Sequence, residues 1–196
     1  MDRIVTTLTT EALFSDDGLK RFLLRKSWDD SKPKLTIVMM APSIASGISL
    51  DATTQLTLNN CDRMGYGSVS VVNLFAVLND FSLQQAEDED PDNMDVIIQQ
   101  AQDADLIIYA PGVGKVKSKT FQQRQEQVLT ALRPFEEKLH CLCDENGEAR
   151  LQHPLSPAVR TWHLSPLKVN ELLSMPQAEQ EQKKKSKGKK PKNSET

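Results

Sequence analysis

The chain has 196 residues, of which 38% are hydrophobic and 26% are charged, so it is long enough for one domain with a core and too apolar for a disordered chain. No apolar stretch approaches the roughly 20 residues that span a bilayer, and the first residues lack the features of a secretory signal. These observations argue against the membrane-spanning and secreted classes. An odd count of 3 Cys favours reduced thiols, and we expect a cytoplasmic protein.

The formal net charge of -3 hides an asymmetry along the chain. Residues 181–196 hold seven lysines, all within Lys183–Lys192, and two glutamates, so this segment carries +5 and the remaining residues carry -8. We expect residues 176–196 to form a disordered basic tail. Clustered lysines release counterions from phosphates, which favours sequence-independent contact with DNA or a nucleotide. A solubilising end without a specific partner is the open alternative.

The first part of the chain predicts an arm, a strand and a helix. Residues 1–34 mix apolar and basic side chains between turn-forming Asp pairs, and we expect an N-terminal arm that contains an edge strand or a hairpin. The apolar run Leu35–Met40 predicts a buried strand that leads into a loop of small residues. Over residues 50–64 apolar side chains recur with helical spacing. Asp51 is well placed to cap this helix and Gly65 to end it.

Strands and helices continue to alternate along the rest of the chain. The β-branched run from Ser68 predicts a second strand, and a helix is expected over Met94–Ala104. The sequence "DLIIYAPGVG" predicts a third buried strand that ends in a Pro-Gly turn. A Gln-rich helix over Ser118–Leu132 precedes a fourth strand in "KLHCLCDENG", and a last short helix is expected near Leu167–Leu173.

This order of elements is typical of an α/β domain, which we expect to span residues 35–175. Continuous apolar strands are typical of parallel sheets that are covered on both faces. The predicted fold is a three-layer α/β/α sandwich with a central, mostly parallel four-stranded sheet. Ligands of such sheets bind beyond the carboxyl ends of the strands, so the loops at that edge should bring together Ser43, Asn73, Gly112, Gly114 and His153.

Several short motifs, taken in order, resemble a known family. The segments "MMAPSIAS", "DATT", "GYGSVSVVNLFAV" and "HPL" resemble the bacterial and phage domain of unknown function 1643, and the likeness covers roughly Leu19 to Leu173. Members of that family typically carry Asn-Pro-Ser after the first strand, Val-Asn-Leu-Phe in the second and His-Pro-Leu late in the chain. One departure is Ala41, which stands where the family has Asn. The resemblance implies no assigned biochemical role.

The layout is also similar, more distantly, to the uracil-DNA glycosylase superfamily, whose fold and mechanism the likeness implies. Those enzymes have a Pro-containing loop after the first strand, an Asn at the end of the second and a His-Pro loop after the fourth. The resemblance implies a pocket for a flipped-out base, in which Asn73 reads the base edge and His153 donates to the departing base. It assigns substrate contacts to five further residues: Pro42, Ser43, Gly112, Gly114 and Pro154.

Each candidate residue also has a structural interpretation, which the sequence leaves open. Asn73 interrupts an apolar run and, if it is buried, must be satisfied by loop backbone or by a ligand. His153 fits a brace within its loop as well as a donor to a ligand. Asp51 fits a helix cap better than a catalytic acid, although it could substitute for the polar group that Ala41 lacks.

Two functions of different class follow from these observations. The first is an enzyme-like domain that hydrolyses the N-glycosidic bond of a nucleobase in nucleic acid, with Asp51, Asn73 and His153 as catalytic residues. The second is a non-catalytic module that binds a nucleotide or a partner and has lost the chemistry. The chain has no Gly-x-Gly-x-x-Gly or Walker pattern and no spacing that sets a metal site, so we expect neither a cofactor nor a metal ion.

Overall fold

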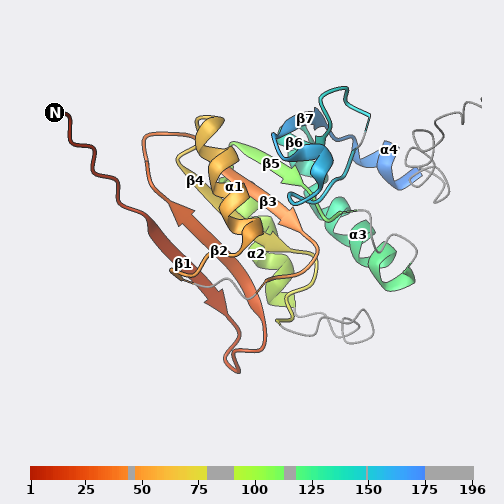
Figure 1. Ribbon diagram of the computed structural model, residues 1–196. Coiled ribbons are helices and arrows are strands. Elements are labelled where there is room, and N and C mark those ends of the chain that lie inside the picture. The colour runs from red at the N-terminus through yellow and green to blue at the C-terminus, as the bar shows by residue number, and fades with distance from the viewer. Residues whose placement is uncertain (44–46, 79–90, 113–117, 149, 175–196) are drawn as a thin grey trace, which may run out of the picture.

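The computed structural model describes residues 1–43, 47–78, 91–112, 118–148 and 150–174. Seven strands form one sheet in the spatial order β1-β2-β4-β3-β5-β6-β7 (Figure 1). In chain order the strands are β1 (Thr9–Phe14), β2 (Arg21–Ser27), β3 (Lys34–Met39), β4 (Ser68–Asn73), β5 (Leu106–Tyr109), β6 (Leu139–Cys143) and β7 (His163–Pro166). The helices are α1 (Ala52–Arg63), α2 (Pro91–Asp103), α3 (Lys119–Leu132) and α4 (Val169–Ser174), with 3-10 helices η2 (Arg133–Lys138) and η3 (Pro157–Val159).

The sheet is mixed, which corrects the predicted fold. β4, β3, β5 and β6 pair in parallel, whereas β1 with β2, β2 with β4 and β6 with β7 pair antiparallel. The expected glycosylase-type sandwich with a central, mostly parallel four-stranded sheet is therefore wrong, because the sheet has seven strands and half of its pairings are antiparallel. The added strands lack continuous apolar runs, since β2 mixes basic and apolar residues and β7 is short and ends in proline.

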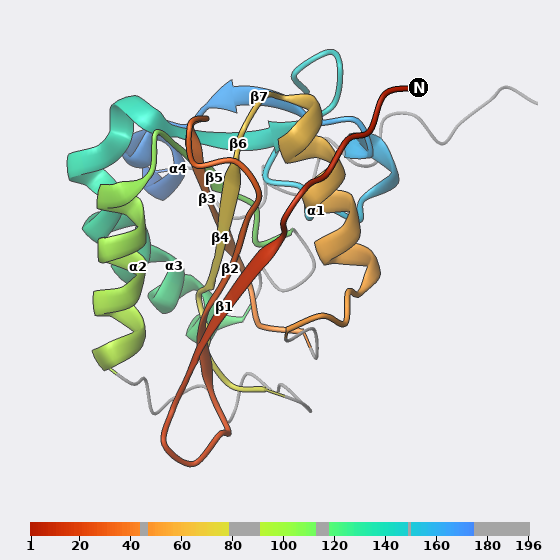
Figure 2. The same ribbon diagram turned by 90° about the vertical axis from the view of Figure 1, so that its left-hand side faces the viewer.

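Helices cover both faces of the sheet (Figure 2). α1 lies on one face, and α2, α3 and α4 lie on the other. Each face has its own apolar core: Ile37 and Ile108 pack beneath α1, whereas Val38 and Ile107 pack beneath the other three helices. Neighbouring residues of one strand point to opposite faces, so a strand that is buried on both sides is mostly apolar along its length. No helix in the described ranges is long and apolar enough to cross a membrane.

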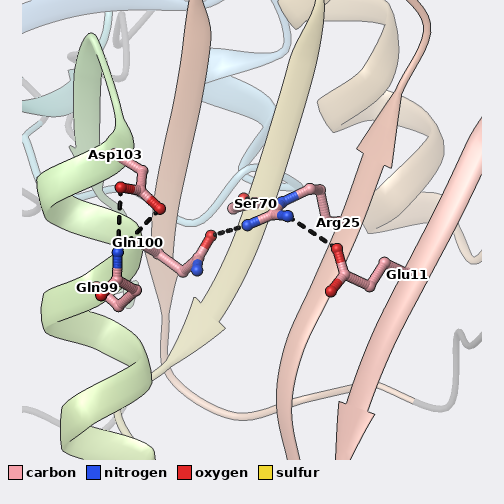
Figure 3. Close-up of polar contacts among 6 residues, drawn as sticks. All are labelled: Glu11, Arg25, Ser70, Gln99, Gln100 and Asp103. Carbon is pink, nitrogen blue, oxygen red and sulfur yellow. Dashed lines mark hydrogen bonds and ion pairs between the residues drawn. The ribbon is translucent and has the colours of Figure 1, made fainter.

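The segment before residue 35 contributes β1 and β2 to this sheet, and Arg25 of β2 connects them to the rest of the domain. Its guanidinium donates from Nη1 to Glu11 of β1 at 2.8 Å and from Nε to Ser70 of β4 at 3.2 Å. Nη2 donates to Gln100 of α2 at 2.7 Å (Figure 3). One charged fork therefore joins three strands and a helix, and each of its nitrogens has an oxygen acceptor.

Asn60, buried on α1, fastens the long connection between β6 and β7 to that helix. Its Nδ2 donates to the backbone oxygens of Leu56 and Arg160 at 3.0 and 3.1 Å. Its Oδ1 accepts from the backbone nitrogen of Trp162 at 3.1 Å. The same connection carries His153, so this contact helps to fix the position of the imidazole relative to α1.

We expect Asn60→Ala to lower the free energy of unfolding by about 2 kcal/mol, because it removes the acceptor of the buried Trp162 backbone nitrogen and the donor to the Arg160 backbone oxygen. Urea-induced unfolding measures the change. Asn59→Ala, at the exposed neighbouring position of the same helix, is the matched control and should change stability little. Equal effects of the two substitutions would contradict the fastening role of Asn60.

Candidate functional site

A pocket of about 130 Å³ lies where β3 and β4 end, at the carboxyl edge of the parallel strands. Four of the residues predicted from the sequence line it together: Pro42, Ser43, Asn73 and His153. They come from the loop after β3, the last residue of β4 and the connection between β6 and β7, which are far apart in the chain. Parallel pairing brings the carboxyl ends of the strands to one edge of the sheet, which explains why these loops converge.

The other predicted residues around this edge have different positions. Gly112 lies against His153, and a Cβ at position 112 would be 3.1 Å from the His153 Cβ. Its φ of +79° is a conformation that favours glycine. Position 112 therefore requires a residue without a side chain, both for its backbone conformation and for its close contact with His153. Pro154 is buried directly after the histidine. Gly114 lies outside the described residues.

Asp51 caps α1 beside the pocket and carries a negative charge. Its Oδ1 accepts from the backbone nitrogen of Thr54 at 2.7 Å, which confirms the predicted cap. Burial acts to raise the pKa of this carboxyl, but hydrogen bonds from Ser43 and Thr54 and the charge of Arg21 outweigh it, so the pKa lies below its ordinary value. The carboxylate is therefore ionised at neutral pH, and its interactions tie the helix start to the preceding loop.

Arg21, which the sequence interpretation missed, also lines the pocket. The residue is 2% exposed, and its Nη1 donates to the backbone oxygen of Ser43 at 3.1 Å. Burial lowers the pKa of the guanidinium, and the charge of Asp51 opposes that shift. Arg21 thus holds the loop after β3 and offsets the charge of Asp51. Its sequence context, "LKRFLLRK", gave no signal of burial, because arginine in a basic stretch is usually solvated.

Asn73, the last residue of β4, has a buried side-chain amide without partners. The residue is 1% exposed, and within the described part of the chain neither its Oδ1 nor its Nδ2 has a hydrogen-bond partner. Its backbone oxygen, in contrast, accepts from Asn93 Nδ2 at 3.2 Å. A buried polar group left unpaired costs on the order of 1–3 kcal/mol, so the amide does not stabilise the fold. Asn73 is also one of the residues that line the pocket.

His153 contributes a neutral imidazole to the lining. Its Nδ1 accepts from the backbone nitrogen of Leu155 at 3.1 Å, so the ring proton of the neutral form is on Nε2. Burial lowers the pKa of the imidazole, and the charge of Asp51 only partly opposes this effect. The same residue therefore braces its own loop through Nδ1 and keeps Nε2–H available as a donor.

Taken together, the pocket offers directed hydrogen bonds with little net charge. Arg21 and Asp51 offset each other, and Asn73 and His153 are neutral donors or acceptors. The volume corresponds to roughly four water molecules at about 30 Å³ each, so it suits a small polar molecule. Among the residues that the structure describes, no group of three or more His, Cys, Asp or Glu could hold a metal ion.

Comparison with known proteins gives a match to one family. A family model described as "Protein of unknown function (DUF1643)" matches residues 21–155, a range that includes every pocket residue named above. β1 and the residues before it lie outside that range. No curated protein and no solved structure matches the chain. The comparisons therefore give the chain a family but assign no role to the pocket.

We expect Gly112→Ala to destabilise the protein by about 2 kcal/mol, since a methyl group would be strained at positive φ and would also crowd His153. Gly147→Ala is the control for backbone strain alone, because Gly147 has a φ of +74° with nothing within 4 Å of a Cβ, and should cost about 1 kcal/mol. Urea unfolding of both variants gives the difference. Equal losses of stability in the two variants would mean that a methyl group at position 112 does not crowd His153.

A second prediction concerns pH and follows from the lowered pKa of His153. The unfolded chain takes up a proton on this ring at a higher pH than the folded chain does, so stability is lost as the pH falls below about 6.5. We expect His153→Asn, which can keep an acceptor for the Leu155 amide, to lose less stability than wild type between about pH 7.5 and 5.5. Unfolding curves at both pH values measure this, and parallel losses in the two proteins would contradict it.

Proposed function

The chain belongs to the DUF1643 family of proteins of unknown function, and from that premise we propose that its pocket binds a nucleobase and that the domain cleaves the base from its sugar. One observation carries the proposal: the Asn73 amide is buried in the pocket lining, and both its donor and its acceptor are unpaired within the described residues. Buried polar side chains are usually paired, so each unpaired one calls for an explanation, and a role in binding is one such explanation.

The edge of a nucleobase carries hydrogen-bond partners of the kind that the Asn73 amide does not find within the described chain. Bases carry neighbouring donors and acceptors along their edges, and an asparagine amide can pair with such an edge through two hydrogen bonds. That pairing would satisfy both unpaired atoms of Asn73 at once, which turns a destabilising group into a source of affinity. The small volume of the pocket and its offset charges favour the base itself over a phosphate group.

Hydrolysis of the N-glycosidic bond is the reaction that these side chains would support. The oxygen of water bonds to C1′ of the sugar, the bond between C1′ and the base nitrogen breaks with its electron pair leaving on the base, and the base takes the proton that the water loses. Nε2–H of His153 would donate to the base as negative charge develops there. The ionised Asp51 would favour the positive charge that develops on the sugar.

The surroundings of the pocket support a polynucleotide as the source of the base. Ile48, Leu50 and Leu155 are 98%, 42% and 43% exposed, and they lie in the connections that carry Ser43 and His153. Exposed apolar side chains can insert where bases are unstacked, and a base inside a duplex must be extruded before an enzyme reaches it. The basic segment Lys183–Lys192 lies outside the described residues, and we assign it sequence-independent attraction to phosphates.

A non-catalytic binding module is the second candidate, and Ala41 favours it. Ala41 lines the pocket where the resembled family pattern has Asn, and a methyl group cannot orient a water molecule. Asp51 is already engaged by Ser43 and Thr54, which limits its freedom to replace that group. In this alternative the same pocket would hold a base or nucleotide without cleaving it.

We expect Asn73→Leu to keep or raise the free energy of unfolding while it abolishes base binding, because leucine has a similar size and removes the unpaired polar atoms. A residue that pins the fold would instead lose stability on this change. Urea unfolding gives the first quantity, and calorimetric titration with a panel of free nucleobases gives the second. Asn93→Leu is the matched control: its amide donates to the oxygens of Asn73 and Leu74, so the change should destabilise by about 2 kcal/mol.

Base release from uracil-containing and modified-base DNA separates the two candidates. Hydrolysis predicts release by wild type that falls at least tenfold in His153→Asn, which loses the Nε2 donor but can keep the acceptor for Leu155. Saturable binding without release in either protein would favour the module. The nucleobase proposal as a whole is rejected if no base or base-containing strand binds wild type, or if Asn73→Leu binds as well as wild type does.

A further inference from the structure

The two outer strands of the sheet differ in how their free edges are protected. β7 has four residues and ends at Pro166, whose backbone oxygen accepts from Arg150 at 2.6 Å. β1 has six residues without proline or lysine, and its single charge, Glu11, is paired with Arg25 at 2.8 Å. Proline, lysine and short length are the devices that keep sheet edges from pairing with other chains. β7 has such protection, whereas within the described residues β1 has only a register irregularity near its end, between Leu13 and Phe14.

Exposed apolar side chains are concentrated in β1 and in the segments directly before and after it. Of the ten large hydrophobic residues that are exposed in the described part of the chain, seven lie in the first 19 positions: Met1, Ile4, Val5, Leu8, Leu13, Phe14 and Leu19. The first residues lead into β1 at the outer side of the sheet (Figure 1). Concentrated apolar exposure of this kind marks an interaction surface, and here it coincides with a strand edge.

We propose that β1 pairs antiparallel with β1 of a second copy of this chain, about a two-fold axis beside Thr10, so that a homodimer shares one continuous sheet. In this register Glu11 lies opposite Thr9 of the second copy, and Leu8 lies opposite Ala12. No like charges face each other. The stretch 6–14 is rich in Thr, with Leu and Phe, and such cross-strand pairs stabilise a sheet.

A second copy fits this edge because one strand supplies both halves of the contact. A two-fold interface uses the same surface twice, so the surface must be complementary to itself. β1 meets that condition, since its only charge is paired within its own chain and the uncharged Thr10 lies at the proposed two-fold axis. The strand also lies outside the family match, which begins at residue 21, so this dimer contact is a property of this chain beyond the matched region.

Sedimentation velocity of the full chain over a wide concentration range tests the proposal. We expect wild type to reach twice the mass of one chain and to dissociate on dilution. The double substitution Leu8→Lys with Leu13→Lys should remain monomeric, because it places lysines on the edge in both copies. The matched control, Ile48→Lys with Leu155→Lys, adds the same charge at exposed apolar positions beside the pocket and should dimerise like wild type.

Single-chain mass of wild type at every concentration, an assembly other than a dimer, or a dimer of the Leu8/Leu13 variant overturns the proposal. A monomeric Ile48/Leu155 control does so as well, because it moves the contact to the pocket side. Circular dichroism establishes that each variant is folded. If the edge variant is unfolded, Thr10→Cys gives a second test, since the register predicts a disulfide-linked dimer on oxidation, and its absence rejects that register and the proposed contact.

Discussion

Two buried cations of β2 hold the loop between β3 and α1, and the geometry of the candidate site depends on them. Arg21 donates to the backbone oxygen of Ser43, and Lys26 donates to that of Gly47. The two residues are 2% and 1% exposed, and burial lowers the pKa of the Lys26 ammonium. Cations leave water at a high free-energy cost unless strong acceptors replace the solvent. The loop backbone supplies those acceptors, so it is fixed at two points by the neighbouring strand.

Polar side chains that join the elements of the fold are hydrogen-bonded, whereas the Asn73 amide in the pocket lining is unpaired within the described chain. Arg25 and Asn60 are satisfied by acceptors and donors from several elements, and they join strands, helices and loops into one body. Asn73 sits in the same kind of dry environment with an amide that meets no protein partner in the described chain. The described chain holds other buried polar atoms without a partner, among them Thr57 Oγ1 and the indole nitrogen of Trp162, but at Asn73 both the donor and the acceptor of one side chain are unpaired. A ligand that forms hydrogen bonds with the Asn73 amide would offset the free-energy cost of burying that amide unpaired.

The sequence indicated the centre of the fold better than its edges. Strands such as β3 and β5 are continuous apolar runs, and Asp51 has the side chain that a helix start requires, so local patterns determine them. The loops of the site could be placed at one edge because parallel strands end together. Arg21 could not be identified, because its burial depends on an acceptor in a loop 22 positions away. β7 was missed for a similar reason, since its pairing with β6 sets its conformation and its composition does not.

Thr10 of the outer strand is in contact with a lysine that also holds the loop between β3 and α1. Its hydroxyl accepts from the Lys26 ammonium at 2.9 Å, and the same ammonium donates to the backbone of the loop that leads to Asp51. The Lys26 side chain therefore links the outer strand to that loop, although β2 and β4 lie between β1 and β3 in the sheet. In the proposed dimer the two-fold axis lies beside Thr10, so the contact between the two chains would be one side chain, Lys26, away from the backbone of the loop that carries Ser43.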